Sequence, residues 1–171
     1  MKKSLLALAV LAVATSATAA TVYDKDGTSL KVGGRVQAIA YNGNFDKAGK
    51  DDSTLKNSAR FNVAGTTKVN DSVSVFAFTE WEASNGDDTD NFATRDQYVG
   101  VDFGVFGKVQ AGKSFNSIYD VQAATDVFEE TGALVQGDTT SRGNRRAGTV
   151  RYIYDNNGLY AAASFQFAQD G

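Results

Sequence analysis

Residues 30–41, LKVGGRVQAIAY, alternate between two kinds of side chain. The even-numbered positions are uncharged, whereas the odd-numbered positions include Lys31, Arg35 and Gln37. A period of two indicates a β-strand, because successive side chains of a strand point to opposite faces. An arginine that faces lipid near mid-membrane costs about 2–4 kcal/mol, so the charged face requires water. The stretch therefore predicts a membrane-spanning strand with Arg35 turned toward a lumen.

The same alternation recurs along the chain, and the joining segments are alternately short and long. Short turns are expected at residues 70–71, 104–107 and 156–158, and long loops at residues 42–55, 84–94 and 114–143. This pattern predicts an all-β fold, a transmembrane antiparallel β-barrel with about seven strands in this chain. Because an open sheet edge in lipid leaves backbone groups unpaired, we expect the chain to be the amino-terminal part of a longer barrel.

The first residues have the features of an export signal. A basic start, an apolar stretch from Leu5 to Ala14 and the small residues Ala17 and Ala19 predict removal of residues 1–19. The apolar stretch is too short for a spanning helix. We therefore expect an exported chain with a mature barrel domain over residues 20–171.

Composition excludes several kinds of site. The sequence has no cysteine and no histidine, which excludes thiolate metal sites, imidazole zinc sites and histidine-assisted nucleophiles. Loss of Lys2 and Lys3 with the leader takes the formal net charge from −3 to −5. This acidity gives no support to nucleic-acid binding. We expect no enzyme activity, no cofactor and no metal.

Charged side chains fall on the faces predicted to point inward. They are the arginines Arg35, Arg60, Arg95, Arg145 and Arg151 and the carboxylates Glu80 and Glu82. Residues 95–103 alternate poorly, and with Arg95 inward, Asp96, Tyr98 and Asp102 are expected to face outward. Arg146 would need a bulge to join the inward set. Rings of charge are a means by which pores select ions, so we expect these residues to line a pore.

The longest loop carries opposite charge. It holds Asp120, Asp126, Glu129 and Glu130, and residues 117–128 are expected to form a short helix capped by Ser117. If this loop folds into the lumen, its carboxylates face the arginines across a narrowed channel.

Other functions fit parts of the sequence. Glu80 and Glu82 could form the carboxylate pair of a glycoside hydrolase, and residues 87–91 could attract calcium. Inward Phe76 and Phe78 could stack on sugars. The chain could also be a structural or adhesive barrel without an open channel, or a soluble calyx, which would require its apolar face inside.

Several segments resemble the trimeric general diffusion porins of Gram-negative outer membranes. They are residues 20–27 (ATVYDKDG), 32–36 (VGGRV), 106–113 (FGKVQAGK) and 129–133 (EETGA). The resemblance covers the whole mature segment. It departs from the family at Lys113, where arginine is usual, and in the loop at residues 84–94, which is shorter than the family's subunit latch.

The resemblance implies a 16-stranded barrel, a homotrimer in outer-membrane lipid and a third loop folded inside. Arg35, Arg60, Arg95 and Arg145 or Arg146 match the basic wall of the constriction, and Asp126 and Glu130 match its acidic loop. The implied function is passive diffusion of ions and small hydrophilic solutes, and the net charge of −5 suggests a mild cation preference.

Overall fold

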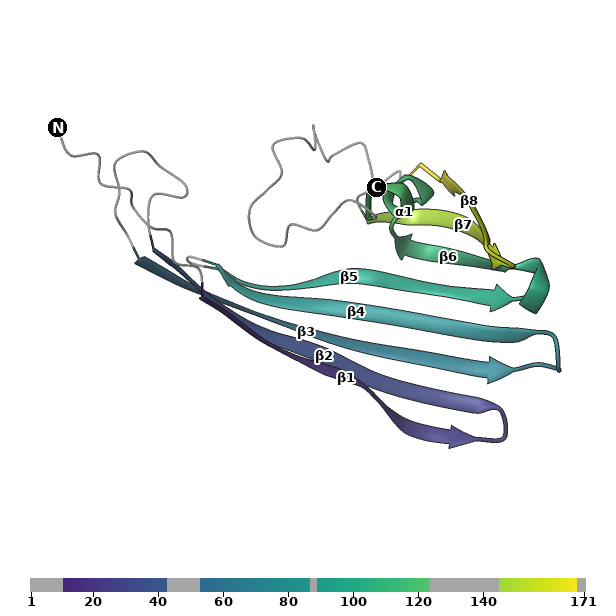
Figure 1. The fold of residues 1–171 in the computed structure, drawn as a ribbon, viewed down its shortest axis with the longest axis horizontal. Coiled ribbons are helices and arrows are strands. Elements are labelled where there is room, and N and C mark those ends of the chain that lie inside the picture. The colour runs from purple at the N-terminus through teal and green to yellow at the C-terminus, as the bar shows by residue number, and fades with distance from the viewer. Residues whose placement is uncertain (1–10, 43–52, 87–88, 124–144, 169–171) are drawn as a thin grey trace.

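The computed structural model describes residues 11–42, 53–86, 89–123 and 145–168. They form one antiparallel sheet of eight strands in chain order (Figure 1). The strands are β1 (Leu11–Lys25), β2 (Thr28–Asn42), β3 (Ser53–Lys68), β4 (Ser74–Gly86), β5 (Thr89–Asp102), β6 (Lys108–Ser114), β7 (Arg146–Asn156) and β8 (Leu159–Gln166). A 3-10 turn, η1 (Gly104–Phe106), and a helix, α1 (Ser117–Ala123), interrupt them. The predicted all-β antiparallel class is confirmed.

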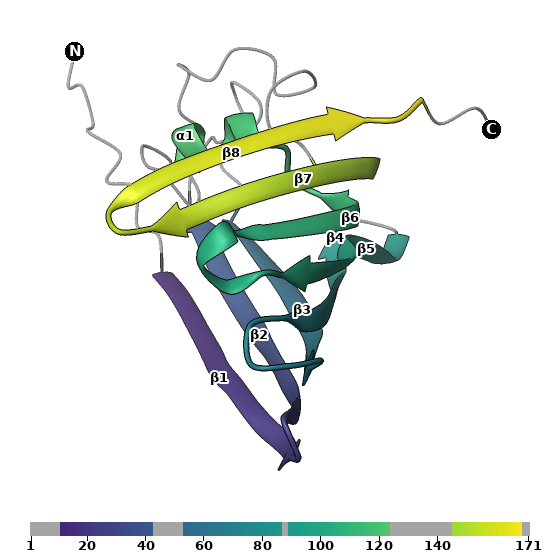
Figure 2. The same cartoon turned by 90° about the vertical axis from the view of Figure 1, so that its right-hand side faces the viewer.

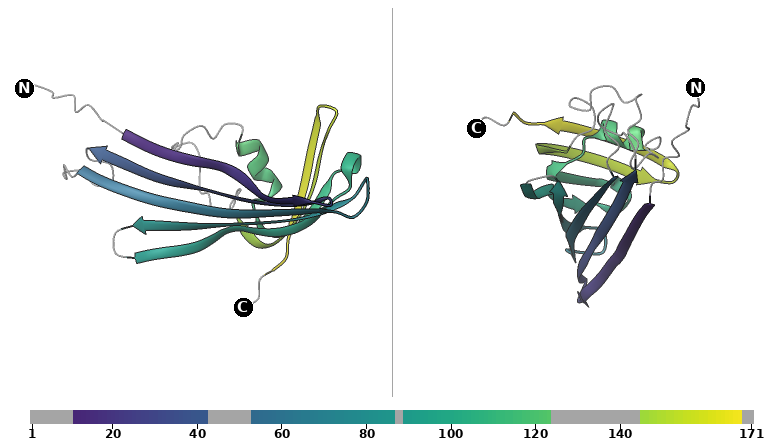
Figure 3. Two further views of the ribbon diagram at one scale, coloured as in Figure 1. Left: turned by 90° about the horizontal axis from the view of Figure 1, so that it is seen from below. Right: turned by 90° about the vertical axis from the view of Figure 1, so that its left-hand side faces the viewer.

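The sheet is long at one side and short at the other. Strands β1 to β5 run side by side as long ribbons, while β6 to β8 are shorter and turn across them (Figures 1 and 2). Helix α1 lies beside β8 (Figure 3). Strands β1 and β8 form the edges of the described sheet and do not pair with each other there. Among the described helices, none is long and apolar enough to cross a membrane.

The predicted tight turns are present at one end of the sheet. Asn157 and Gly158 both have positive φ, at 52° and 76°, and join β7 to β8 as a two-residue hairpin. The side chain of Asn70 accepts hydrogen bonds from the backbone N–H groups of Ser72 and Val73, each at 2.9 Å. These two hydrogen bonds close the turn between β3 and β4.

Two expectations about strand boundaries were wrong. The described residues form eight strands where about seven were predicted, because β1 pairs with β2 despite its irregular alternation and two register shifts. The segment 84–94 is no long loop: β4 continues to Gly86 and β5 begins at Thr89. Polar side chains such as Asn85 and Asp90 suggested a loop, yet their backbones pair across the two strands.

The predicted export signal ends inside β1. Residues 11–17 pair with β2 from Ala40 to Gly34. Removal of residues 1–19 stays a prediction, and it would leave this part of β2 without its present neighbour.

Burial in this sheet is inverted relative to a soluble protein. Among the described residues, Ile153 is the one buried hydrophobic side chain. The buried polar and charged residues are Gln37, Asp96, Gln110, Ser114, Thr149 and Arg151. By contrast, Val36 is 62% exposed and Phe165 is 63% exposed. A soluble sheet covers its apolar face, so this sheet suits an apolar medium on one side and water on the other.

A β-bulge explains the poor alternation of β5. Glu80 pairs with Asp96 and Trp81 with Thr94, so Arg95 is an extra residue. The bulge places Asp96 and Tyr98 on the inward face instead of the predicted outward face. The ring of Tyr98 accordingly lies 5.4 Å from that of Phe78, measured between centroids. Asp102 pairs with Ser74 and follows the same inward parity, so its outward prediction was also wrong.

Candidate functional site: the charged face of the sheet

Four charged side chains form a chain of ion pairs across β3, β4 and β5. Arg60 Nε donates to Glu82 Oε1 at 3.0 Å, and Arg95 Nε donates to Glu80 Oε1 at 2.9 Å. Arg95 Nη1 also donates to Glu82 Oε2. Glu82 is therefore shared between two guanidinium groups. We call these four residues the central ion-pair chain.

The strand register builds this chain. Arg60 lies directly opposite Glu82, and Glu80 is two residues away on the same face of β4. The bulge then turns Arg95 to the same face, within reach of both carboxylates. Side-chain exposures of 16–25% leave the four groups partly in contact with solvent. At this exposure a single pair contributes up to about 1 kcal/mol, and a shared network holds its geometry better than an isolated pair.

Arg35 lies next to this chain but outside it. Its cross-strand neighbour is Arg60, a like charge. Among the described residues no ion pair includes Arg35, and its buried Nε atom has no hydrogen-bond partner. Arg35, Arg60 and Arg95 against Glu80 and Glu82 leave one positive charge in excess on this part of the face.

A second cluster joins β5 to the residues that flank α1. Arg145 Nε donates to Asp96 Oδ2 at 2.6 Å, and Asp96 is 7% exposed. The guanidinium carbon of Arg145 lies 3.8 Å from the centroid of the Phe115 ring. That ring stacks on Tyr119 of α1 with centroids 3.5 Å apart and planes 3° apart. We call this line of four side chains the stacked cluster.

Helix α1 is attached to β7 and β8 on the inward face. Asp120 accepts hydrogen bonds from Arg151 Nη2 and, at 2.7 Å, from Tyr160 OH. Ser117 and Ser164 bond through their hydroxyl oxygens at 2.8 Å. The cap is Asn116 rather than the predicted Ser117, since Asn116 Oδ1 accepts from the N–H groups of Ile118 and Tyr119.

The structure brings most of the predicted charged residues to one face. Arg145 is held at this face by its ion pair with Asp96. Arg146 is exposed and lies opposite Ser114 in the sheet. Asp126 and Glu130 lie outside the described residues. Sequence reasoning missed Asp96 and Phe115. The poor alternation of residues 95–103 was a usable signal, because a bulge is one way to break a period of two.

The alternative sites find little support in the geometry. Glu80 and Glu82 both accept hydrogen bonds from arginines, so both carboxylates are engaged within the central ion-pair chain. In the described part of the chain no three acidic, histidine or cysteine side chains gather to hold a metal ion. The outward apolar side chains also contradict a calyx with an apolar interior.

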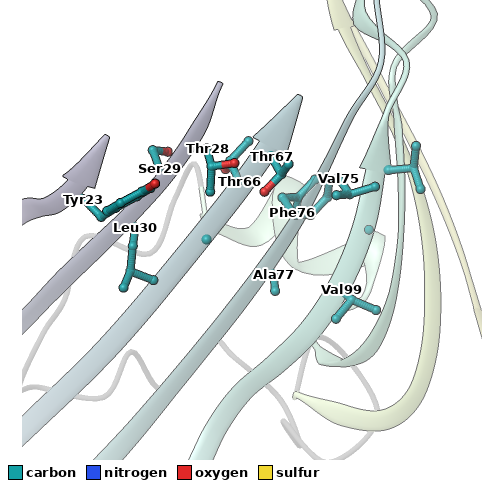
Figure 4. Close-up of a pocket in the computed structure, with 13 residues that line it drawn as sticks. Tyr23, Thr28, Ser29, Leu30, Thr66, Thr67, Val75, Phe76, Ala77 and Val99 are labelled. Carbon is teal, nitrogen blue, oxygen red and sulfur yellow. The ribbon is translucent and has the colours of Figure 1, made fainter. Parts of the chain in front are cut away.

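The opposite face of the sheet carries shallow apolar grooves. One of about 790 Å³ is lined mainly by outward side chains at the turn end of β2 to β5, among them Leu30, Ala77 and Val99 (Figure 4). A second of about 400 Å³ lies beside it and includes Val63 and Ala111. No charged side chain lines either groove.

On β2, β3, β4 and β8 one face carries no charged side chain among the described residues, and the ion pairs lie on the other face. The family profile of Gram-negative porins matches residues 6–171. This chain belongs to the Gram-negative porin family. The match confirms the predicted family and, with it, the outer-membrane location.

Individual porins are similar over most of this chain. Outer membrane porin PhoE of Escherichia coli (strain K12) is 35% identical over 154 residues, which cover 86% of this chain and 42% of PhoE. Outer membrane porin C of Enterobacter cloacae is 31% identical over 156 residues, 89% of this chain and 42% of that porin. The putative outer membrane protein YedS of E. coli K12 is 35% identical over 167 residues, 94% of this chain and 99% of YedS. The chain thus spans less than half the length of the PhoE and porin C relatives.

Proposed function

We propose that this porin chain lines a water-filled outer-membrane channel through which ions and small hydrophilic solutes diffuse passively. In this proposal residues 1–19 are removed on export, and residues 20–171 contribute strands to a closed barrel of 16. The charged face borders water, and the uncharged face meets lipid or a neighbouring copy in a homotrimer.

The separation of charge between the two faces carries the proposal. On β2, β3, β4 and β8, the outward rows contain no charged side chain in the described residues, while the inward rows hold the central ion-pair chain. Reversing the sidedness would put several guanidinium groups into lipid at about 2–4 kcal/mol each. The proposed orientation avoids this cost.

Selectivity would come from the width of the channel and from its charges. Arg35, Arg60 and Arg95 form a basic wall, and Arg145 extends it to the position where Asp96 neutralises it. Glu80, Glu82 and Arg151 also line the lumen in this proposal. We place Asp126 and Glu130 across the wall, on the loop that begins with α1. Because the mature net charge is −5, we propose a mild cation preference.

A structural or adhesive barrel without an open channel is the alternative. It would need a lumen filled by apolar side chains. The inward face instead carries arginines, glutamates and the buried amides of Gln37 and Gln110, which favours a wet interior.

Reversal potentials of the intact protein in a planar bilayer test the channel and its preference. We expect Arg60→Ala combined with Arg95→Ala to increase the cation preference a few-fold and to admit larger solutes in liposome swelling. Each lost charge acts over about 10 Å at roughly 0.4 kcal/mol in water, so two together give an effect of this size. High salt should reduce the shift in selectivity.

The matched control is Lys25→Ala combined with Lys68→Ala, which removes the same charge from exposed positions at the turn end of the sheet. It should leave both measurements unchanged. A clear anion preference would refute the proposed selectivity, and an absence of conductance would refute the channel.

A further inference from the structure

The stacked cluster forms an unbroken line of contacts from β5 to α1. It runs from the Asp96 carboxylate to the Arg145 guanidinium at 2.6 Å, and from there to the Phe115 ring at 3.8 Å. The parallel ring of Tyr119 completes the line at 3.5 Å. Asp96 and Tyr119 are 23 residues apart in the sequence, so the cluster joins elements that no backbone pairing connects.

The chemistry of Arg145 suits this place. A guanidinium group is planar, so it can donate from its edge to a carboxylate while its face lies on an aromatic ring. Asp96 is 7% exposed, and charged hydrogen bonds strengthen where water is scarce. A lysine would offer neither the plane nor the directed edge. Asp96 therefore fixes the orientation of Arg145, and the plane of Arg145 fixes that of Phe115.

The other attachments of α1 lead elsewhere. Asp120 binds Arg151 and Tyr160, and Ser117 binds Ser164, so these contacts hold the helix to β7 and β8. Among the side-chain contacts of the described residues, the stacked cluster alone links the helix toward β5. Two attachments in different parts of the sheet define a position, whereas one would leave the helix free to swing about it.

We infer that Asp96 is a positioning residue that acts through Arg145 and Phe115 to set where α1 lies over the charged face. It also neutralises Arg145, which removes that charge from those a permeating ion meets. The consequence for conduction rests on the proposed function, while the placement of the helix does not.

Distances between spin labels test the placement directly. The sequence has no cysteine, so Val36→Cys on β2 and Val121→Cys on α1, both well exposed, can be labelled as a pair. We expect one narrow distance distribution in the reconstituted intact protein. Asp96→Asn should broaden it by shifting the equilibrium between attached and detached helix roughly tenfold, the size expected for a hydrogen bond between charged groups.

Two variants separate this role from loss of charge or loss of structure. Asp102→Asn makes the same charge change on the same strand but keeps an acceptor for the N–H of Gly104, so the distribution should stay narrow. Asp96→Glu retains the carboxylate and should restore it. An unchanged distribution in Asp96→Asn, or an equal broadening in Asp102→Asn, would overturn the inference.

If Asp96→Asn prevents assembly, the aromatic contact provides the test. Phe115→Leu keeps the apolar volume and removes the stacking surface, and Phe115→Tyr keeps the ring. We expect a broad distribution in the first and a narrow one in the second, and equal distributions would refute the inference. Reversal potentials of the same proteins report on conduction: a protein with the expected distances but no conductance would contradict the proposed function and leave the positioning role intact.

Discussion

The two halves of this sheet achieve their charged face in different ways. From β2 to β4 the register runs without a shift, and every inward charge follows from a period of two. From β5 to β7 the register shifts at Arg95 and again after Gly112. The regular half pairs its charges with one another within the sheet. In the irregular half, Arg145 and Arg151 instead contact α1 and the adjacent Phe115 on the inward face.

This difference indicates that the bulges have a structural purpose. A regular β5 could not place both Arg95 and Asp96 on the inward face, because neighbouring side chains alternate. The bulge allows Arg95 to complete the central ion-pair chain while Asp96 starts the stacked cluster. Lys113 Nζ donates to the carbonyl oxygen of Thr94 at 2.5 Å and so supplies a partner beside the irregular pair.

Single-residue deletions should separate the halves most sharply. Deleting Val63 from the regular strand β3 shifts the residues on one side of the deletion by one position relative to β2 and β4. In the proposed orientation this shift turns Arg60 toward lipid, so we expect the barrel not to assemble. Deleting Arg95 removes the extra residue of the bulge and leaves every other pair in place. We expect assembly at a cost of the ion pairs that Arg95 makes, on the order of 1–3 kcal/mol.

Assembly can be followed by the electrophoretic mobility of heated and unheated protein in detergent. If the barrel assembles equally well with either deletion, the register of β3 is not determined by the separation of charged and uncharged side chains between its two faces.

The sequence predicts the regular half well for a physical reason. Alternation over residues 30–41 and 58–69 separates charged from uncharged side chains, and this pattern alone places Arg35 and Arg60 on the same face of the sheet. Strand pairing uses backbone hydrogen bonds and does not require apolar side chains. The polar residues 84–94 therefore led to a wrong prediction of where β5 begins. Asp96 and Phe115 meet their partners through a bulge and through contacts between residues distant in sequence. The period of two in the sequence gives no information about either.

A charge placed on the outward face of the regular half should have the next largest effect. Val36→Arg puts a guanidinium on a row that otherwise lacks charge, and we expect a loss of about 2–4 kcal/mol in the free energy of unfolding if Val36 lies near mid-membrane. Val121→Arg adds the same group to α1, where the helix belongs to the wet side, and should change stability by less than about 0.5 kcal/mol. Denaturant unfolding in lipid vesicles compares the two, and equal losses would contradict the assigned sidedness.

Neutralising the shared carboxylate tests the wall itself and has the smallest expected effect on stability. Glu82→Gln leaves Arg60 and Arg95 with weaker acceptors, and Glu80→Gln affects Arg95 alone. Since these side chains are partly exposed, we expect losses of about 1 kcal/mol and about half that, respectively. Selectivity should respond more clearly than stability, because either change adds one positive charge to a face that already has one in excess.

Reversal potentials should therefore move toward anions by a similar amount in both glutamine variants, while unfolding separates them. This contrast distinguishes a purely structural network from a pore wall. A structural network unconnected with the pore would show the difference in stability and no change in selectivity. A pore wall whose charges act mainly through the local potential would show the reverse, since the potential depends on the number of charges and not on which arginine each carboxylate binds.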